Sequence, residues 1–191
     1  MLEKKRPLKI FLCHSSLDSF LAHRLYLQLI SEGAMVWFDE ESLLLGQKGE
    51  EEIPKSIKES DIVIVCLSSD SVQSEGYIHT EIKLALGIAD KKPDGKIFVV
   101  PIRFDDCIVP SDLNKYHWAN FYENNGYVKL LKTLRVHANS ISVSLEPKDQ
   151  KIVEHGNDLP TASTFVEKRK ANNELFKKMK NKRTGLNSYS I

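Results

Sequence analysis

The chain has 191 residues, of which 41% are hydrophobic and 28% are charged, and its formal net charge is +1 at pH 7. This length suits one domain with a substantial core plus a tail, and it is too short for two large domains. The near-neutral charge and ordinary apolar fraction argue for a soluble globular protein and against an overall nucleic-acid binder.

The N-terminal segment and the cysteines indicate a cytoplasmic protein. Only a short apolar run follows the first basic residues, without the features of a secretion signal, and no stretch approaches the roughly 20 apolar residues that span a membrane. Cys13, Cys66 and Cys107 are odd in number and widely spaced, which suits buried thiols in a reducing compartment. We expect no membrane segment, disulfide or zinc site.

Short apolar segments alternate with helical patterns in the first part of the chain. Near-continuous apolar runs predict strands covered on both faces, and a repeat of about four residues predicts helices. In chain order, the pattern predicts a strand at Leu8–Cys13, a helix carried by Leu21, Leu25 and Leu29, a weaker strand at Met35–Asp39, and a helix marked by Ile53 and Ile57. Gly33 is placed to end the first helix, and Pro54 predicts that the second is short or bent.

The same alternation continues to about residue 134. The next predicted elements are a strand at Asp61–Leu67, a helix carried by Ile78, Ile82, Ala85 and Ala89, a strand at Lys96–Ile102, a short strand at Trp118–Tyr122 and a last helix around Tyr127–Leu134. Connections of helical length require right-handed crossovers between parallel strands. The sequence therefore predicts an α/β fold: a flavodoxin-like open five-stranded parallel sheet, order 2-1-3-4-5, with helices on both faces.

The periodicity fades from about Asn139. Residues 139–191 contain ten Lys/Arg and six Asp/Glu, a net charge of +4, which leaves −3 for residues 1–138. We interpret the chain as a domain, 1–138, with a basic, partly helical or flexible C-terminal extension, 139–191. A solvated linker and surface helix is the simpler interpretation of this extension, and the lack of interleaved aromatic residues favours it over a docking arm for nucleic acid or an acidic partner.

Small polar residues follow three of the predicted strands. In a doubly wound sheet, ligands bind outside the carboxyl ends of the strands where the strand order reverses. His14, Ser15 and Ser16 follow the first strand, Ser68 follows the third, and the second ends at Asp39, so we expect them around one crevice. Turns and helix caps are the simpler role of the serines, and no nucleophile elbow marks any of them.

Tyr77 and Glu81 are four residues apart on the helix that follows the third strand, so they share one helical face. An aromatic ring can stack on a planar base, while a carboxylate can hold ribose hydroxyls and stabilise an oxocarbenium-like transition state. The pair therefore suits glycosidic chemistry on a nucleotide, although a solvated carboxylate is the simpler interpretation of an isolated Glu. No P-loop or dinucleotide-binding glycine motif is present, which argues against NTPases and dehydrogenases.

These segments resemble the TIR (Toll/interleukin receptor) family over roughly residues 7–137. KIFLCHSSLDS resembles its first conserved box, VWFDEESLLLGQ its second strand and loop, and SEGYIHTEI the start of its third helix. The resemblance implies the TIR fold. It places Glu81 at the position of the catalytic glutamate of the NAD-cleaving TIR enzymes, and Tyr77 at that of their aromatic residue, usually tryptophan.

The resemblance also implies the remaining site residues. The segment around His14 corresponds to the loop that lines the nucleotide site, and the Ser42–Lys48 loop to the segment that shapes the pocket and makes TIR-to-TIR contacts. Leu45 stands where a proline often precedes the loop glycine. The implied substrate-binding residues are His14, Ser15, Ser16, Asp39, Lys48, Ser68 and Tyr77.

The implied activity is NAD glycohydrolysis, which releases nicotinamide and ADP-ribose or a cyclic isomer. NAD is then a consumed substrate, and no cofactor or metal is expected. Similarity to bacterial TIR proteins implies a role in antiphage immune signalling and self-association between TIR domains on activation, and it leaves open a downstream effector protein as a partner.

Two other functions stay open. The chain could be a non-catalytic TIR interaction or adaptor module that recruits partners through the Ser42–Lys48 loop, or, on weaker grounds, a flavin or nucleotide binder of the same fold. The enzymatic interpretation expects Glu81 to face His14–Ser16 across the crevice. Burial of Glu81, or its rotation away from the crevice, weakens that interpretation without affecting the fold.

Overall fold

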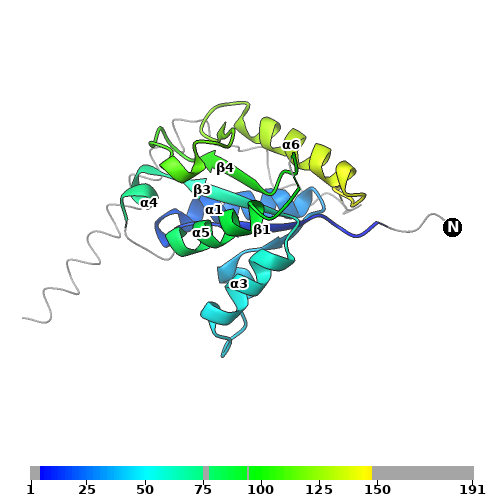
Figure 1. Ribbon diagram of the computed structural model, residues 1–191, viewed down its shortest axis with the longest axis horizontal. Coiled ribbons are helices and arrows are strands. Elements are labelled where there is room, and N and C mark those ends of the chain that lie inside the picture. Colours follow the sequence, from blue (N-terminus) through cyan, green and yellow to red (C-terminus); the bar gives the residue numbers. More distant parts are fainter. Residues whose placement is uncertain (1–4, 75–77, 94, 148–191) are drawn as a thin grey trace, which may run out of the picture.

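The computed structural model describes residues 5–74, 78–93 and 95–147, which form one sheet covered by helices (Figure 1). The strands are β1 (Lys9–Cys13), β2 (Met35–Trp37), β3 (Ile62–Leu67), β4 (Val99–Arg103) and β5 (Ala119–Asn120). Their order is β2-β1-β3-β4-β5, and each neighbouring pair is parallel. The predicted fold class and strand order are confirmed.

Six α-helices and two 3₁₀ turns lie between the strands or after the last one in the described ranges. They are η1 (Ser16–Asp18), α1 (Ser19–Ser31), α2 (Asp39–Ser42), α3 (Gly49–Glu59), α4 (Ser69–Gln73), α5 (Ile78–Ala89), η2 (Ser111–Leu113) and α6 (Gly126–Ser140). α3 is eleven residues long and contains Pro54 without ending at it. The sequence pattern misses α2 and α4, because helices of four and five residues are too short to show periodicity.

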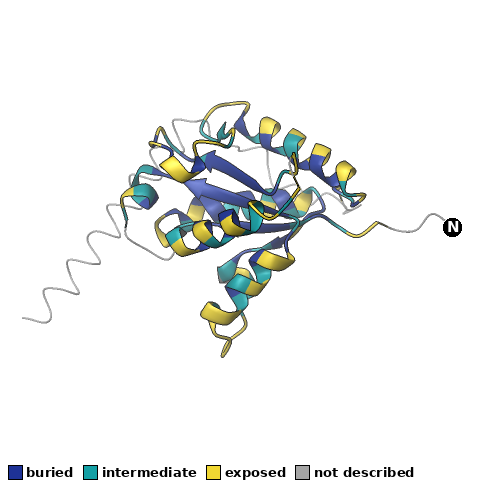
Figure 2. Cartoon of the chain, viewed as in Figure 1, coloured by how far each residue is buried: buried dark blue, intermediate teal, exposed yellow. Residues whose placement is uncertain are grey.

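Two helices cover each face of the sheet. Alternate residues of a strand point to opposite faces, so Ile10 and Leu12 of β1 pack with α1 and α6, whereas Phe11 and Cys13 pack with α3 and α5. All six residues of β3 are buried. Figure 2 shows the buried strands at the centre and the exposed residues on the outer helix surfaces. None of the described helices has the length and apolarity to cross a membrane.

The segment after α6 packs across the amino ends of the strands. Ser144 pairs with Pro7 in a parallel bridge, and the Leu8 amide donates to the Ser144 carbonyl at 2.9 Å. Val143 and Leu145 are buried. The packed structure therefore continues past residue 138, the predicted end of the domain. Residues 148–191 lie outside the described ranges, and the division of the chain at 138 stays a prediction.

Gly33 is the residue at which this segment meets the turn between α1 and β2. It has a φ of 88°, and a Cβ added there would lie 1.9 Å from the carbonyl oxygen of Glu146. Its position just after α1 confirms the prediction that it ends this helix. An L side chain at Gly33 would thus meet both left-handed strain and a backbone clash.

We expect Gly33→Ala to lower the free energy of unfolding by roughly 2 kcal/mol or more, because it adds a clash to the backbone strain. Gly95→Ala is the matched control: Gly95 has a φ of 79° and no atom within 4 Å of an added Cβ, so only strain of about 1 kcal/mol applies. Urea denaturation measures both variants. Equal losses would contradict the close approach of Glu146.

Candidate functional site

The carboxyl ends of β1 and β3 meet at the point where the sheet order reverses. β1 and β3 are neighbours, but the chain continues from β1 towards β2 and from β3 towards β4. The Ser68 hydroxyl, just after β3, donates to Asp18 Oδ2 at 2.6 Å, and both residues are buried. This hydrogen bond links the two strand ends at the edge where ligands of such sheets bind.

Glu81 lies in the first turn of α5, against the end of β1. It is 8% exposed, and the Cys13 thiol acts on the pKa of its carboxyl group as a hydrogen-bonding neighbour. Burial raises the pKa of Glu81 to about 7, while the hydrogen bond from Cys13 opposes this rise and the charge of Asp39 adds to it. The folded protein therefore holds at neutral pH a carboxyl group poised between its two protonation states.

The burial of Glu81 differs from the open carboxylate expected from the sequence. The side chain does reach the carboxyl edge, as expected, but α5 packs on both β1 and α3, and this packing presses its first turn onto the strand ends. A substrate can contact Glu81 only if this corner opens. In the described conformation the burial weakens the enzymatic interpretation and leaves the fold assignment unaffected.

His14 is packed between Asp39 and an aromatic ring. Its Nε2 lies 3.6 Å from Asp39 Oδ1, and its ring centroid is 4.7 Å from that of Phe38. The His14 side chain is 3% exposed, whereas that of Asp39 is 40% exposed. Asp39 is thus the accessible carboxylate of this corner. Sequence spacing gave His14 no acidic partner, because the partner comes from the end of a different strand.

The predicted serines divide into two capping residues and one exposed residue. Ser15 Oγ accepts a hydrogen bond from the Leu17 amide at 3.3 Å, and Ser68 Oγ accepts one from the Ser71 amide at 3.0 Å. Ser68 has no exposed surface, whereas Ser16 is exposed. The geometry favours the simpler capping role for Ser15 and Ser68 and leaves Ser16 accessible.

Lys48 is not brought to this corner by any described contact. Lys48 Nζ lies 3.3 Å from Glu51 Oε1, and its side chain is 77% exposed, so it has the environment of a solvated surface lysine. Tyr77 lies outside the described residues, and its pairing with Glu81 stays a prediction.

The sequence pattern identified Cys13 only as a buried thiol and did not link it to Glu81. Cys13 is the last residue of β1 and lies on the same face as Phe11, which is the face that α5 covers. Strand alternation could therefore have placed Cys13 under α5. It could not have shown which residue of α5 lies above it.

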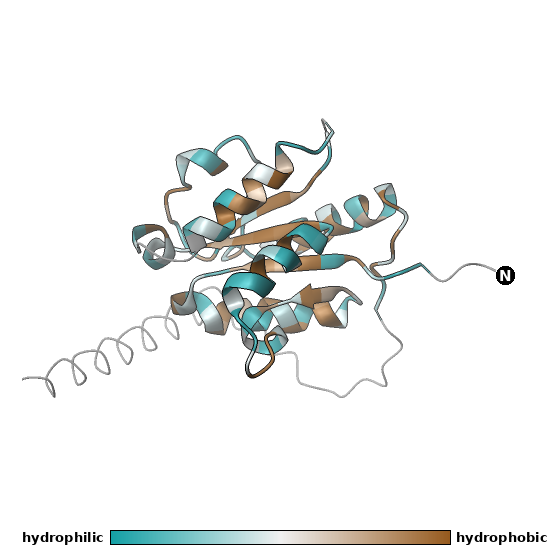
Figure 3. Ribbon diagram, turned by 60° about the horizontal axis from the view of Figure 1, so that its bottom comes forward, coloured by the Kyte–Doolittle hydropathy of each residue, from teal (hydrophilic) through white to brown (hydrophobic). Residues whose placement is uncertain are grey.

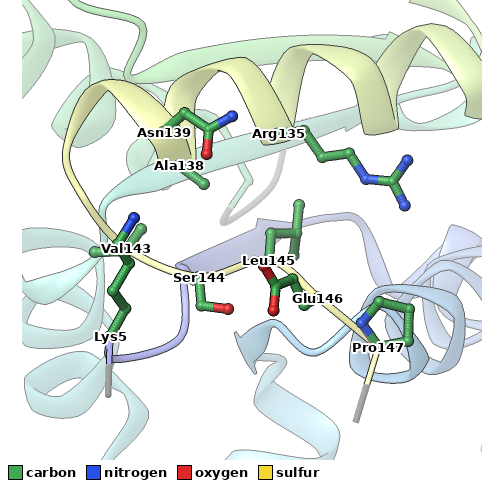
Figure 4. Close-up of a pocket in the computed structure, with 9 residues that line it drawn as sticks. All are labelled: Lys5, Arg135, Ala138, Asn139, Val143, Ser144, Leu145, Glu146 and Pro147. Atoms are coloured by element: carbon green, nitrogen blue, oxygen red, sulfur yellow. The ribbon is translucent and has the colours of Figure 1, made fainter. Parts of the chain in front are cut away.

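Two cavities among the described residues lie elsewhere in the domain. One of about 290 Å³ lies beside the end of α6 (Figure 4) and is lined by Lys5, Arg135, Ala138, Asn139, Val143, Ser144, Leu145, Glu146 and Pro147. The other, of about 260 Å³, is lined by Lys9, Ile10, Met35, Val36, Trp37, Ser42, Ser56, Glu59 and Ser60. Neither lining includes Cys13, His14 or Glu81. No cluster of potential metal ligands occurs in the described part of the chain.

Comparisons with known proteins agree with this architecture. The TIR domain of the Toll-related receptor TRR-2 from Hydra magnipapillata is 18% identical with a TM-score of 0.55, over 66% of this chain and 97% of that chain. A prokaryotic SEFIR domain is 17% identical with a TM-score of 0.50, over 68% and 97%. No curated protein matches the chain. The family model of the TIR domain matches residues 10–134, more than half of the chain, and the chain therefore belongs to the TIR domain family.

Proposed function

We propose that the protein is an NAD glycohydrolase in which Glu81 stabilises the positive charge that develops on the ribose as nicotinamide leaves. The observation that supports this proposal is the pKa of Glu81, raised to about 7, at the carboxyl edge of a parallel sheet, where ligands of such sheets bind. Buried carboxyl groups with strongly raised pKa values concentrate at functional sites. The resemblance to NAD-cleaving TIR enzymes, which places Glu81 at the position of their catalytic glutamate, supports the same residue.

Cleavage of NAD needs a negatively charged group beside ribose C1′ rather than a proton donor for the leaving group. The bond between ribose C1′ and the nicotinamide nitrogen breaks, and its electron pair neutralises the positively charged ring, so the leaving group takes no proton. Water then bonds to C1′ and loses a proton to give ADP-ribose, or an atom of the same molecule bonds there to give a cyclic isomer. A carboxylate beside C1′ stabilises the oxocarbenium-like transition state, and poor hydration strengthens its field.

Asp39 and Glu81 have surroundings that suit different roles. Asp39 is the more exposed carboxylate, whereas Glu81 is buried. Two carboxyl groups with different surroundings commonly divide the work of a glycosidic site. We assign to Asp39 the contact with substrate hydroxyl groups and to Glu81 the electrostatic stabilisation of C1′, with Ser16 as an accessible polar contact and His14 as a packing partner of Asp39.

The biological role that we propose comes from the family resemblance. NAD cleavage would serve antiphage immune signalling, through NAD depletion or a nucleotide product that acts on a downstream effector. Because Glu81 is buried in the described conformation, the active state requires the corner around it to open. We propose that self-association between TIR domains provides this opening.

A catalytic Glu81 predicts that Glu81→Ala lowers nicotinamide release from NAD by at least about 100-fold, since it removes the stabilising charge. The full chain should be assayed at high concentration with excess NAD, and released nicotinamide measured by chromatography. Glu123→Ala, at an exposed position, is the control and should keep the wild-type rate. Equal rates of nicotinamide release by wild type and Glu81→Ala, or no nicotinamide release by the concentrated wild type, would contradict the enzymatic proposal.

The raised pKa of Glu81 also predicts a pH-dependent cost in stability. The carboxyl has an ordinary pKa of 4.5 and titrates near 7 in the folded protein, so the folded state binds the extra proton between these values. Its favourable contribution is complete below pH 4.5 and is lost as the pH rises through 7. Glu81→Gln, which resembles the protonated side chain, should therefore be more stable than wild type above pH 7, by up to about 3 kcal/mol.

Urea denaturation at about pH 4 and about pH 8 tests this dependence. The advantage of Glu81→Gln should be largest at the higher pH and should disappear at the lower one. Glu123→Gln is the control for the change in net charge and should show no such dependence. A difference between Glu81→Gln and wild type that is the same at both pH values would contradict the raised pKa.

An adaptor function is the second candidate, supported by the loop between α2 and α3. Leu44 and Leu45 are 69% and 106% exposed, and Figure 3 shows hydrophobic residues along this projecting loop. Adjacent leucines on a loop are a suitable contact for another protein.

This surface predicts that Leu44→Asp/Leu45→Asp lowers self-association, measured by analytical ultracentrifugation, because charges replace the apolar contact. Ile108→Asp, at a position 85% exposed in a different loop, is the control. If the double variant and wild type associate equally, the loop is not the contact. If the loop variant loses association and wild type releases no nicotinamide, the adaptor function replaces the enzymatic one.

A further inference from the structure

A buried hydrogen bond joins η1 to the start of α4 at the carboxyl edge of the sheet. Asp18 ends η1, which follows β1, and Ser68 follows the neighbouring strand β3, 50 residues later (Figure 1). The Ser68 hydroxyl donates to Asp18 Oδ2 at 2.6 Å. Asp18 is 2% exposed and Ser68 has no exposed surface. A distance this short is typical of a hydroxyl that donates to an ionised carboxylate.

The carboxylate of Asp18 does not cap its own helix. Asp18 is the N-cap residue of α1, where an aspartate side chain commonly accepts a hydrogen bond from the first turn, yet its side chain makes no capping hydrogen bond. The positive end of the α1 dipole still favours its negative charge, and this offsets part of the cost of burying a charged group. The described hydrogen bond of the carboxylate therefore goes to a distant segment of the chain.

Ser68 uses its hydroxyl group in two hydrogen bonds. The oxygen accepts from the Ser71 amide at 3.0 Å, while the proton goes to Asp18. The Ser68 amide in turn donates to the Ser71 hydroxyl at 2.7 Å, which completes a capping box at the start of α4. Because a hydroxyl group has only one proton to donate, the bond to Asp18 leaves Ser68 none to offer a substrate.

η1 carries an accessible polar residue of this edge. Ser16 is exposed, and the turn around it is closed by the Asp18 amide, which donates to the Ser15 carbonyl at 2.8 Å. A turn of three residues has little stability of its own, and the same is true of α4, which has five residues. The two elements pack on each other. The bond between Asp18 and Ser68 therefore joins two elements that both need support from elsewhere.

We propose that Asp18 is a positioning residue: through its buried hydrogen bond with Ser68 it fixes η1 against α4 and thereby holds Ser16 in place for a substrate. The contact of Ser16 with a substrate rests on the proposed NAD cleavage. The joining of η1 to α4 does not depend on that activity.

A contribution to the stability of the domain alone is the simpler role of this hydrogen bond. Ser71 separates the two roles, because it is buried and caps the same helix from the other side of the capping box. Ser71→Ala weakens α4 but leaves the hydroxyl of Ser68 and the carboxylate of Asp18 in place, so it is the matched control. A general loss of stability affects all variants alike, whereas a positioning role distinguishes Asp18→Asn and Ser68→Ala from Ser71→Ala.

Amide hydrogen exchange, followed by NMR on the full chain, tests whether the bond joins the two elements. We expect Ser68→Ala to speed exchange of the Asp18 amide about tenfold, because a hydrogen bond to a charged group is lost. Asp18→Asn should speed exchange of the Ser71 and Val72 amides by a smaller factor, because asparagine keeps a neutral acceptor. Ser71→Ala should speed exchange within α4 and leave the Asp18 amide unchanged.

The exchange measurement has two results that would overturn the proposal. One is unchanged exchange across the bond, in η1 for Ser68→Ala and in α4 for Asp18→Asn. The other is an equal rise at the Asp18 amide in Ser71→Ala. Two variants, one from each side of the bond, are used so that one failing to fold does not prevent the comparison.

The second readout is the KM for NAD in the nicotinamide-release assay. A displaced Ser16 weakens substrate binding, so Asp18→Asn and Ser68→Ala should raise KM about three- to tenfold and leave kcat within about twofold. Ser68→Thr keeps the hydroxyl group and should raise KM less than Ser68→Ala. In a Ser16→Ala background, Asp18→Asn should raise KM no further, because it acts through Ser16. An undiminished rise in that background would overturn the proposal.

The two readouts separate failure of this inference from failure of the proposed function. Faster exchange across the bond, without nicotinamide release from wild type or any variant, would support the joining of η1 to α4 and reject NAD cleavage. Nicotinamide release with unchanged exchange and unchanged KM in Asp18→Asn and Ser68→Ala would support NAD cleavage and reject the role of Asp18.

Discussion

The burial of β3 on both faces is the constraint on which the rest of the structure depends. Its six residues are all buried, and five of them are aliphatic, so no charged side chain can lie within the central strand. Polar groups near the sheet are therefore confined to its edges. Because all five strands are parallel, their carboxyl ends meet at one edge, and His14, Asp39 and Ser68 follow their strands at that edge.

At this edge the fold contains a carboxyl group, that of Glu81, whose ionised form is unfavourable. Glu81 is buried beside a second carboxylate, which disfavours its ionisation, and two features of its position partly offset this cost. The Cys13 thiol lowers its pKa, and the first turn of α5 is the end at which a helix favours negative charge. A stable core would not need a carboxyl here. A buried carboxyl group that costs stability is the kind of feature on which the proposed site rests.

The elements with continuous apolar runs could be predicted from sequence, and the contacts between them could not. β1, β3 and β4 were recognisable because strands buried on both faces need no polar residue. The strand predicted at Met35–Asp39 ends earlier, at Trp37, because Asp39 begins a helix too short to show a period. The burial of Glu81 was also not predictable: it precedes Ile82 at the border of the apolar stripe, and only the packing of α5 on β1 decides its environment.

Different residues lie at the amino ends and at the carboxyl ends of the strands. The difference limits how the predicted extension, residues 139–191, could influence Glu81. At the amino edge, Arg6 holds Asp61 with two hydrogen bonds of 2.6 and 2.8 Å, and Ser144 pairs with Pro7. The described residues end at this edge, at Pro147. Glu81 lies at the other edge, about 20 Å away along six residues of β3. A partner bound where the extension begins would therefore not cover Glu81, and its influence would have to pass through the sheet or α6.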